Sequence, residues 1–190
     1  PLGVKSIGLV EVKTDSNIVG IGETYSGVYT PEFISAIINQ IKPFLIGKDA
    51  MDINEIYQSL QIPFISNSGL YKSIISAVDI ALWDIKGKAL NKPIAELLNK
   101  NYNKTVKVYA SGGSVVMTPK QISKDVEKII DKGYLAYKMR VGYQEWENDL
   151  ERVEAAKYIL KENNSLMVDA IMGTLNRWNL NEATKKELQL

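Results

Sequence analysis

Two short stretches of strand-favouring residues open the pattern of hydrophobic and polar positions along the chain. They occupy residues 4–13 and 18–25, and the segment between them, 14–17, consists of the turn formers Thr, Asp, Ser and Asn. Two strand-like runs joined by so short a polar segment predict a β-hairpin.

Hydrophobic positions at helical spacing follow this hairpin. A first helix is predicted between the N-cap signal Thr30-Pro31 and the break at Pro43. Asp52 and Glu55 form a capping pair that predicts the start of a second, short helix. A third helix is the clearest, and we expect Gly87 to end it. Its hydrophobic stripe consists of Ile74, Ile75, Val78, Leu82 and Ile85.

The pattern changes near residue 104, where strands begin to alternate with longer helices. Strands are predicted at 106–110, 135–141 and 166–169. Because strands that alternate with helices normally form parallel sheets with right-handed crossovers, we expect these three to be parallel.

Thr118 and Pro119 give the N-cap and first-turn signals of the helix that follows the first of these strands. The inner side of the next helix is predicted to consist of Trp146, Leu150, Val153 and Ile159. A last helix starts near 179–182, and no strand follows it. The pattern therefore predicts an α+β domain at 1–104 and an α/β domain, incomplete in this chain, at 105–190.

Composition narrows the possible functions. The chain has 190 residues, 45% of them hydrophobic and 24% charged, with a formal net charge of +1. This balance gives no basic field for nucleic acid, and no apolar run approaches a membrane span, so neither partner is expected. Cysteine and histidine are absent. Chemistry within these residues must therefore use Lys, Arg, Asp, Glu or Tyr. The first residue is Pro1 rather than Met, which favours a processed or trimmed chain.

Two cations in one predicted strand are the first candidates for such chemistry. Lys138 and Arg140 are two positions apart, so they project on the same side of the strand. One interpretation is a solvated face, because two cations on one sheet face are costly to bury. The other is a ligand site, because Asp169 closes the next parallel strand and the carboxyl ends of such strands meet at one rim. One carboxylate beside two cations suits a metal ion and an anionic substrate together.

A glycine pair follows the strand predicted at 106–110. The segment Ser111-Gly112-Gly113-Ser114 precedes a helix, as a phosphate-binding loop does, but it lacks both the Lys-Ser/Thr ending of a P-loop and the dinucleotide fingerprint. We interpret it as a flexible strand-to-helix loop.

A long motif connects the sequence to a known family. Residues 76–89, SAVDIALWDIKGKA, followed by Lys92-Pro93 and Glu96-Leu97-Leu98, resemble the signature of the mandelate racemase and muconate lactonizing enzyme branch of the enolase superfamily. Residues 18–23 resemble the end of that family's first hairpin, and residues 42–49 resemble its following helix and loop. The resemblance implies an α+β capping domain to about residue 104, followed by the first strands and helices of a modified TIM barrel.

The same resemblance implies an active site at the carboxyl ends of the barrel strands. The family's Lys-x-Lys pair corresponds to Lys138-Met139-Arg140, and its first carboxylate ligand to Mg²⁺ corresponds to Asp169. Tyr25 lies in the segment that resembles the family's specificity loop and is implied to contact substrate. The remaining metal ligands and a His–Asp pair are expected beyond Leu190. The shared chemistry is removal of a proton alpha to a carboxylate, with Lys138 and Mg²⁺ meeting the negative charge that develops.

Two departures from the family pattern refine this expectation. Arg140 replaces the second lysine, and a guanidinium stays protonated in proteins, so it is a poor base for racemisation. This favours a sugar-acid dehydratase, with an acid sugar as the small-molecule substrate. Ile171 stands where the family often has Asn, two residues after the ligand. We also expect a cytoplasmic homo-oligomer, and we expect the 190 residues alone to be inactive because most of the active site is missing from them.

Two alternatives stay open at this point. One is a racemase, epimerase or cycloisomerase of the same superfamily. The other, from a different class, is a non-catalytic half-barrel that serves as a binding or assembly module.

Overall fold

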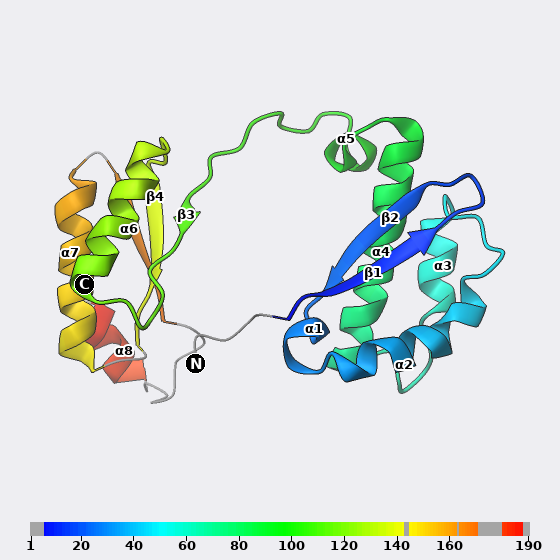
Figure 1. Ribbon diagram of the computed structural model, residues 1–190, viewed down its shortest axis with the longest axis horizontal. Helices are drawn as coiled ribbons and strands as arrows, with labels where there is room; N and C mark the ends of the chain where they lie inside the picture. The colour runs from blue at the N-terminus through cyan, green and yellow to red at the C-terminus, as the bar shows by residue number, and fades with distance from the viewer. Residues whose placement is uncertain (1–5, 143–144, 163, 171–179, 188–190) are drawn as a thin grey trace. The chain divides into compact units, whose positions relative to one another are not determined.

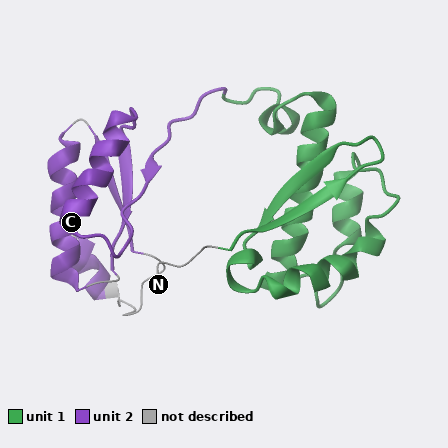
Figure 2. Cartoon of the chain, viewed as in Figure 1, with its two compact units in different colours: residues 1–103 green, residues 104–190 purple. Residues whose placement is uncertain are grey.

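The computed structural model describes residues 6–142, 145–162, 164–170 and 180–187. The chain divides into two compact units, residues 1–103 (unit 1) and residues 104–190 (unit 2), which Figure 2 shows in different colours. Each unit has a hydrophobic core of its own.

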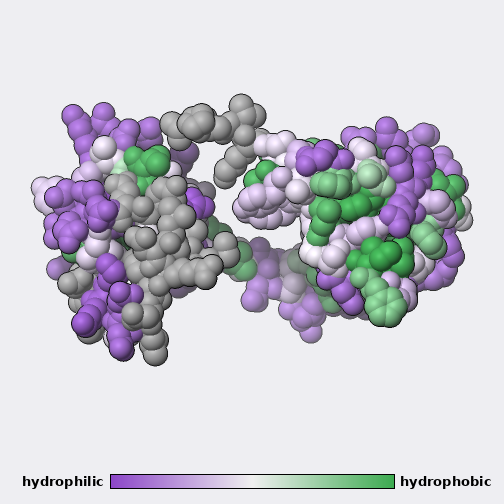
Figure 3. Space-filling view, turned by 90° about the horizontal axis from the view of Figure 1, so that it is seen from below, coloured by the Kyte–Doolittle hydropathy of each residue, from purple (hydrophilic) through white to green (hydrophobic). Residues whose placement is uncertain are grey.

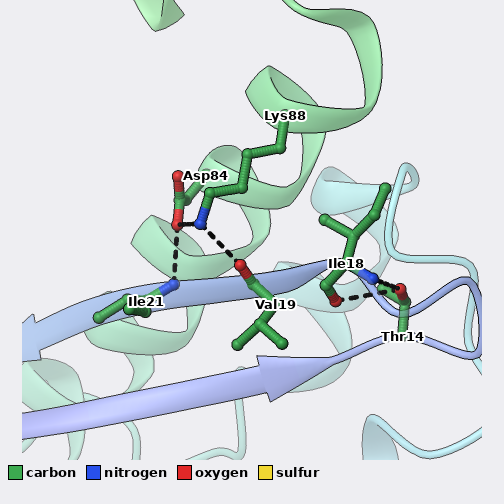
Figure 4. Close-up of polar contacts among 6 residues, drawn as sticks. All are labelled: Thr14, Ile18, Val19, Ile21, Asp84 and Lys88. Atoms are coloured by element: carbon green, nitrogen blue, oxygen red, sulfur yellow. Dashed lines mark hydrogen bonds and ion pairs between the residues drawn. The ribbon is translucent and has the colours of Figure 1, made fainter.

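Unit 1 opens with the predicted hairpin. Strand β1 (Gly8–Lys13) pairs antiparallel with strand β2 (Val19–Thr24). Asn17 lies in the turn at φ 63°, in the left-handed region that Asn adopts more readily than most residues. The Thr14 hydroxyl accepts a hydrogen bond from Ile18 N–H at 3.0 Å (Figure 4). The polar segment between the strands therefore closes the turn, as its composition predicted.

Helix α4 (Gly69–Leu90) packs against this hairpin. Gly22 lies so close to the helix that a Cβ atom there would be 1.8 Å from the carbonyl oxygen of Ala77. Gly20 makes the same approach to Ala81, with 2.0 Å between the added Cβ and the carbonyl oxygen. Only glycine allows strand and helix backbones to come this close, so these two residues set the distance between β2 and α4.

Side chains of α4 also bind the edge of β2 that is not paired with β1 (Figure 4). Asp84 Oδ2 accepts a hydrogen bond from Ile21 N–H at 2.9 Å, and Lys88 Nζ donates to the Val19 carbonyl at 2.7 Å. Lys88 Nζ also lies 2.7 Å from Asp84 Oδ2. Because a strand edge with unpaired backbone groups can pair with another chain, these bonds protect part of the edge.

Shorter helices complete unit 1. They are α1 (Ser26–Tyr29), α2 (Glu32–Ile41), the 3-10 helix η1 (Lys42–Phe44), α3 (Ile53–Ser59) and α5 (Ile94–Leu98). The buried faces of α2, α3 and α4 meet in one core, which includes Ile37, Ile41, Ile53, Ile56, Ile74, Val78 and Ile85. The stripe predicted for the third helix is therefore confirmed as part of this core.

Two helix starts differ from the sequence prediction. Helix α2 has Pro31 rather than Thr30 at its N-cap. At the start of α3, Asp52 occupies the N-cap but its side chain makes no capping hydrogen bond. The expected partner Glu55 instead accepts a hydrogen bond from Lys48 Nζ at 2.7 Å, so the predicted capping pair does not form.

The end of α4 was also predicted wrongly. The helix does not stop at Gly87; it continues to Leu90, and Asn91 ends it in the left-handed region at φ 50°. Gly87 is buried, and a Cβ atom there would lie 3.1 Å from the carbonyl oxygen of Lys92. This glycine therefore permits the segment after the helix to pack closely, and Asn91 supplies the C-terminal stop.

Unit 2 contains a parallel sheet with helices on one of its faces (Figure 1). The strands are β3 (Ala110–Ser111), β4 (Ala136–Arg140) and β5 (Ser165–Asp169), in the order β3-β4-β5. Helices α6 (Pro119–Asp131) and α7 (Trp146–Leu160) connect them, and α8 (Leu180–Glu187) follows. The prediction of parallel strands joined by helices is therefore confirmed, and the last helix begins within the predicted range.

The first strand of this sheet is shorter than predicted. Only Ala110 and Ser111 pair with β4, opposite Tyr137 and Lys138. Residues 106–109 are exposed and lie outside the strand. The apolar alternation there predicted a strand for which the described residues provide no partner.

Helix α6 begins with a complete capping box. The Thr118 hydroxyl accepts a hydrogen bond from Gln121 N–H at 3.4 Å, and the Gln121 side chain accepts one from Thr118 N–H at 2.9 Å. Pro119 occupies the first turn, and Ile122 and Val126 are fully buried. The local signal at this helix start was therefore sufficient to predict it.

The inner face of α7 differs from the prediction. Val153 is buried as expected, whereas the other three predicted positions are only partly buried. Asp149 and Arg152 are instead enclosed, with 0% and 1% of their surface exposed. A hydrophobic pattern cannot predict this arrangement, because these two charges can be buried only when they find partners in the folded chain.

Candidate active site

The carboxyl ends of the three parallel strands lie side by side. Just past β3, the Gly113 carbonyl accepts a hydrogen bond from Arg140 N–H at 3.2 Å. On the other side of β4, Val141 N–H donates to the Asp169 carbonyl at 3.0 Å. Backbone pairing thus continues to the ends of the strands and determines which side chains share this edge.

Strand β4 alternates between its two faces at this edge. Tyr137 and Met139 are fully buried in the core that includes α6 and α7. Lys138 and Arg140 therefore lie on the opposite face, as the spacing predicted, where Lys138 is partly buried and Arg140 is exposed.

The structure brings Lys138 and Asp169 together. Lys138 Nζ lies 2.8 Å from Asp169 Oδ2, and about a third of each side chain is exposed, 31% and 37%. Arg140 lies directly opposite Asp169 in the pairing of β4 with β5. The three residues predicted from the strand ends therefore share one edge of the sheet, although their order along the sequence separates Asp169 from Lys138 by 31 positions.

Charge at this edge favours a protonated lysine. The hydrogen bond from Lys138 to Asp169 raises the pKa of the ammonium above the ordinary value of a lysine, although burial lowers it. The nearby Arg140 guanidinium also lowers the pKa of Lys138, but the balance remains a rise. Lys138 therefore carries a positive charge at neutral pH, as a group that binds a carboxylate must.

Asp169 has the chemistry of a magnesium ligand, since Mg²⁺ prefers carboxylate oxygens. In the part of the chain that the structure describes, no group of three or more His, Cys, Asp or Glu side chains is placed to hold a metal ion. One carboxylate cannot fill the octahedral shell that Mg²⁺ demands. The donor type of Asp169 therefore fits the ion, and further ligands have to complete the site.

Tyr25, the fourth predicted site residue, belongs to unit 1. It occupies the N-cap of α1 and is 65% exposed. Its hydroxyl lies 3.2 Å from that of Tyr29, and the two rings meet edge to face with 5.2 Å between their centroids. This hydrogen bond raises the pKa of Tyr29 above its ordinary value. The sequence analysis interpreted Tyr29 as a packing residue and did not pair it with Tyr25, although a spacing of four residues on a short helix is a signal for such a pair.

The loop after β3 is held by hydrogen bonds that the interpretation as a flexible loop did not include. Gly113 N–H donates to Asp125 Oδ2 at 3.2 Å. Arg152 Nη2 donates to the Gly113 carbonyl at 3.3 Å and to the Ser114 carbonyl at 2.8 Å. The sequence analysis missed Asp125 and Arg152, because the groups they bind lie 12 and 39 positions away in the chain and no local pattern indicates them.

Hydrophobic side chains are also exposed on unit 1, and Figure 3 shows such patches on the face that it presents. An open groove of about 400 Å³ is lined by Ile21, Ile80, Trp83, Asp84, Ile94 and Leu98. Its one charged group, the Asp84 carboxylate, is already bonded to Ile21 N–H and Lys88. The groove is therefore suited to packing rather than to chemistry.

Ile171, the departure near the proposed ligand, lies outside the described residues. Among the residues that are described, no helix is both long enough and apolar enough to cross a membrane.

Comparison with known proteins agrees with this architecture. The family profile described as "Mandelate racemase / muconate lactonizing enzyme, N-terminal domain" matches residues 2–99. A 3,6-anhydro-alpha-L-galactonate cycloisomerase of Streptomyces coelicolor is 30% identical over 179 residues, covering 93% of this chain and 48% of the relative. An L-talarate/galactarate dehydratase of Salmonella typhimurium is 32% identical over 173 residues, covering 90% of this chain and 43% of the relative.

A solved structure is similar over both units. It is a racemase from Streptomyces coelicolor with bound magnesium, which matches with a TM-score of 0.83 and 30% identity over 96% of this chain and 54% of that one. The chain spans about half the length of the curated relatives it matches. These relatives are enzymes of the enolase superfamily, and the profile match covers more than half of the 190 residues. The chain therefore belongs to the mandelate racemase and muconate lactonizing enzyme family, of which it contains the N-terminal domain and a following segment of parallel strands and helices.

Proposed function

We propose that the protein removes the proton alpha to the carboxylate of an acid sugar and then eliminates water, with Mg²⁺ as its cofactor. The observation that carries this proposal is the contact of 2.8 Å between the Lys138 ammonium and the Asp169 carboxylate at the ends of adjacent parallel strands. Ligand sites of parallel α/β folds lie at this edge, and a cation beside a carboxylate suits an anionic substrate together with a metal ion. The proposal also draws support from a relative that is named as a talarate and galactarate dehydratase.

Lys138 binds the substrate carboxylate in this proposal. As a base takes the alpha proton, the electron pair of the broken C–H bond moves toward the carboxylate, and the Lys138 ammonium neutralises the charge that develops there. Asp169 would supply one oxygen ligand to Mg²⁺, which would contribute further positive charge where the negative charge develops. The electron pair then returns to form a double bond between the alpha and beta carbons as the bond from the beta carbon to its hydroxyl breaks. The hydroxyl takes up a proton from an acid and leaves as water, and the enol product becomes the keto acid.

Arg140 holds a substrate hydroxyl or stabilises charge, because a guanidinium stays protonated and does not act as a base. Tyr25 is proposed as a further substrate-binding residue. We place the base and the remaining metal ligands outside these 190 residues, since the chain has no histidine and one candidate ligand on its described strand ends. The 190 residues alone are accordingly inactive, and strands beyond them complete a modified TIM barrel.

The test uses the protein expressed from its complete reading frame and a panel of acid sugars with different configurations. Incubation in D₂O, followed by NMR of the alpha position and an assay for the keto product of dehydration, detects both steps. Wild-type protein is expected to form the product only with Mg²⁺ present, and Lys138→Ala to abolish it while the circular dichroism stays unchanged. The matched control is Lys120→Ala, which removes an exposed lysine of α6. Normal turnover by Lys138→Ala contradicts the proposal.

A racemase is the second candidate, because the similar solved structure with bound magnesium is a racemase. The same experiment separates the two reactions. Exchange of the alpha proton with inversion and without loss of water identifies a racemase, whereas exchange coupled to loss of water identifies a dehydratase. We favour the dehydratase because Arg140 stands where a racemase of this family needs a second base.

A further inference from the structure

We propose that the buried ion pair between Asp149 and Arg152 is a positioning device, which holds the loops after β3 and β4 so that Lys138 and Arg140 keep their geometry at the strand ends. This inference rests on the proposed function, because it concerns the residues that bind the substrate. Neither Asp149 nor Arg152 lies on a strand of the sheet, and neither is a catalytic residue.

Arg152 connects α7 to the loop after β3. Its Nη2 atom donates to the carbonyl oxygens of Gly113 and Ser114, at 3.3 Å and 2.8 Å. Its Nη1 atom lies 2.5 Å from Asp149 Oδ1. The planar guanidinium can make these bonds at once in a fixed geometry, which a lysine ammonium on a flexible stem cannot reproduce.

Asp149 carries the connection on to the loop after β4. Its second carboxylate oxygen, Oδ2, accepts a hydrogen bond from Gly142 N–H at 2.6 Å. Gly142 is the second residue after Arg140, the last residue of β4. A continuous series of hydrogen bonds therefore runs from the end of β3 through Arg152 and Asp149 to the end of β4.

Gly113 is the point at which this series meets the candidate site. Its carbonyl oxygen accepts from Arg140 N–H at 3.2 Å as well as from Arg152. Its φ is +58°, and a Cβ atom there would lie 2.4 Å from Cβ of Met139. The backbone of Gly113 thus lies directly against Met139 of β4 and is bonded to Arg140 N–H, so a shift of this loop moves Arg140.

A second contact fixes the other side of Gly113. Its N–H donates to Asp125 Oδ2, which also accepts a hydrogen bond from the Tyr137 hydroxyl at 2.6 Å. Burial and the bond to Asp125 raise the pKa of Tyr137 well above its ordinary value, so this hydroxyl remains a donor. Asp125 therefore binds the N–H of Gly113, and Arg152 binds its carbonyl oxygen.

The alternative is that the ion pair merely stabilises unit 2. A buried ion pair is weak evidence of stabilisation, because desolvation opposes the attraction between the charges, and apolar replacements of similar volume are often neutral. Arg152 Nε, moreover, is buried without a hydrogen-bond partner among the residues that the structure describes, which adds to the cost. The double replacement Asp149→Leu with Arg152→Met is therefore expected to fold, and it separates stability from positioning.

The experiment measures kcat, KM and Tm in the protein expressed from its complete reading frame, with an acid sugar that the wild type converts. The double variant is expected to keep Tm close to wild type and to lower kcat by about 10- to 100-fold, with KM changed less than about threefold, because small misplacements of reacting groups reduce turnover strongly. Arg152→Lys keeps the positive charge but loses the planar guanidinium that binds Asp149 and two backbone carbonyls at once. Its kcat is therefore expected to lie between those of the double variant and the wild type.

Val153→Ala is the matched control on the same helix. It removes buried methyl groups without touching the hydrogen bonds, so it is expected to lower Tm while kcat stays unchanged below the transition. If the double variant turns over normally, the positioning role is overturned. If kcat follows Tm across all three variants, the pair is structural and the inference is likewise overturned. If the wild type converts no acid sugar, the proposed function itself has failed, and with it the inference.

Discussion

Each unit of the molecule contains a lysine–carboxylate pair beside a strand, and the two pairs differ in what they bind. In unit 1, Asp84 and Lys88 both come from α4, and both bind backbone groups of β2. In unit 2, Lys138 and Asp169 come from neighbouring strands, and their side chains meet at the carboxyl ends of those strands. The distances are nearly the same, 2.7 Å and 2.8 Å.

The difference shows that the role of an ion pair depends on where it lies in the fold. The pair in unit 1 satisfies backbone groups at a sheet edge, so its role is to join helix and strand. The pair in unit 2 lies where parallel α/β folds bind ligands, on a strand whose opposite face is fixed by buried Tyr137 and Met139. The two pairs are thus expected to respond differently to the same substitutions.

Replacement of the lysine in each pair, Lys138 or Lys88, is expected to give the largest difference between the two pairs. Lys138→Ala is expected to abolish measurable turnover, a loss of kcat of at least about 10²- to 10³-fold, because the developing oxyanion loses a fixed positive charge. Lys88→Ala is expected to leave kcat unchanged and to lower the free energy of unfolding by about 0.5 to 1 kcal/mol, because exposed ion pairs contribute little. Steady-state kinetics and urea unfolding measure the two effects. Equal losses of kcat in both variants contradict the assignment.

The approach of β2 to α4 is the next test, because the pair in unit 1 depends on it. Gly22→Ala is expected to lower the free energy of unfolding by about 3 kcal/mol, since the new Cβ clashes with the Ala77 carbonyl backbone and the strand has to move. Gly69→Ala is the control: an added Cβ there has nothing within 4 Å. It is expected to raise stability by about 0.5 kcal/mol, because alanine favours helix over glycine. Urea unfolding measures the free energy of unfolding of both variants. Equal changes in the two variants would exclude the clash as the cause.

Asp84→Ala tests the edge of β2 directly. It removes the acceptor of Ile21 N–H and the partner of Lys88, so the free energy of unfolding is expected to fall by about 1 to 2 kcal/mol. The exposed edge is also expected to promote self-association, which sedimentation velocity measures. Glu55→Ala, which removes the acceptor of an exposed pair with Lys48, serves as control and is expected to leave stability nearly unchanged. A stable, monomeric Asp84→Ala protein contradicts the edge-protecting role.

The smallest expected effect is on the pH dependence of stability. The hydrogen bond from Lys88 lowers the pKa of Asp84, although burial raises it. This pair therefore stabilises the fold above the ordinary Asp pKa, and its contribution is lost as pH falls through the lowered value. Asp169 raises the pKa of Lys138, so that pair contributes below the ordinary Lys pKa and is lost as pH rises through the raised value.

Unfolding free energies in acid and in alkali check these two directions. Asp84→Asn is expected to flatten only the acid dependence and Lys138→Met only the alkaline dependence, and both changes are expected to be small because solvent screens both pairs. If the unfolding free energy of both variants changes with pH as steeply as that of the wild type, the assignment of these groups is contradicted.

Local signals predicted the elements that depend on neighbouring residues. The turn formers at 14–17 give the hairpin, and Thr118-Pro119 gives the start of α6, because capping and turn chemistry act within a few residues. The prediction of a capping pair between Asp52 and Glu55 was wrong, because a residue outside the helix competes for Glu55. Lys48, outside the helix, bonds Glu55, and a local pattern contains no information about such a competitor.

The candidate site shows the same division. Alternation along β4 was enough to place Lys138 and Arg140 on one face and to propose Asp169 at the next strand end. The hydrogen bonds of Asp149 and Arg152 were not predictable in this way, because Arg152 reaches Gly113 and Ser114, 39 and 38 positions earlier in the chain.

The sequence by itself determined the order of strands and helices, the face of β4 that carries the cations, and the family motif in α4. The tertiary structure alone decided which charges are paired, which are buried, and which glycines permit close contact. The physical reason is the range of the interactions: turns, caps and side-chain alternation depend on adjacent residues, whereas burial of a charge depends on partners that folding brings from distant parts of the chain.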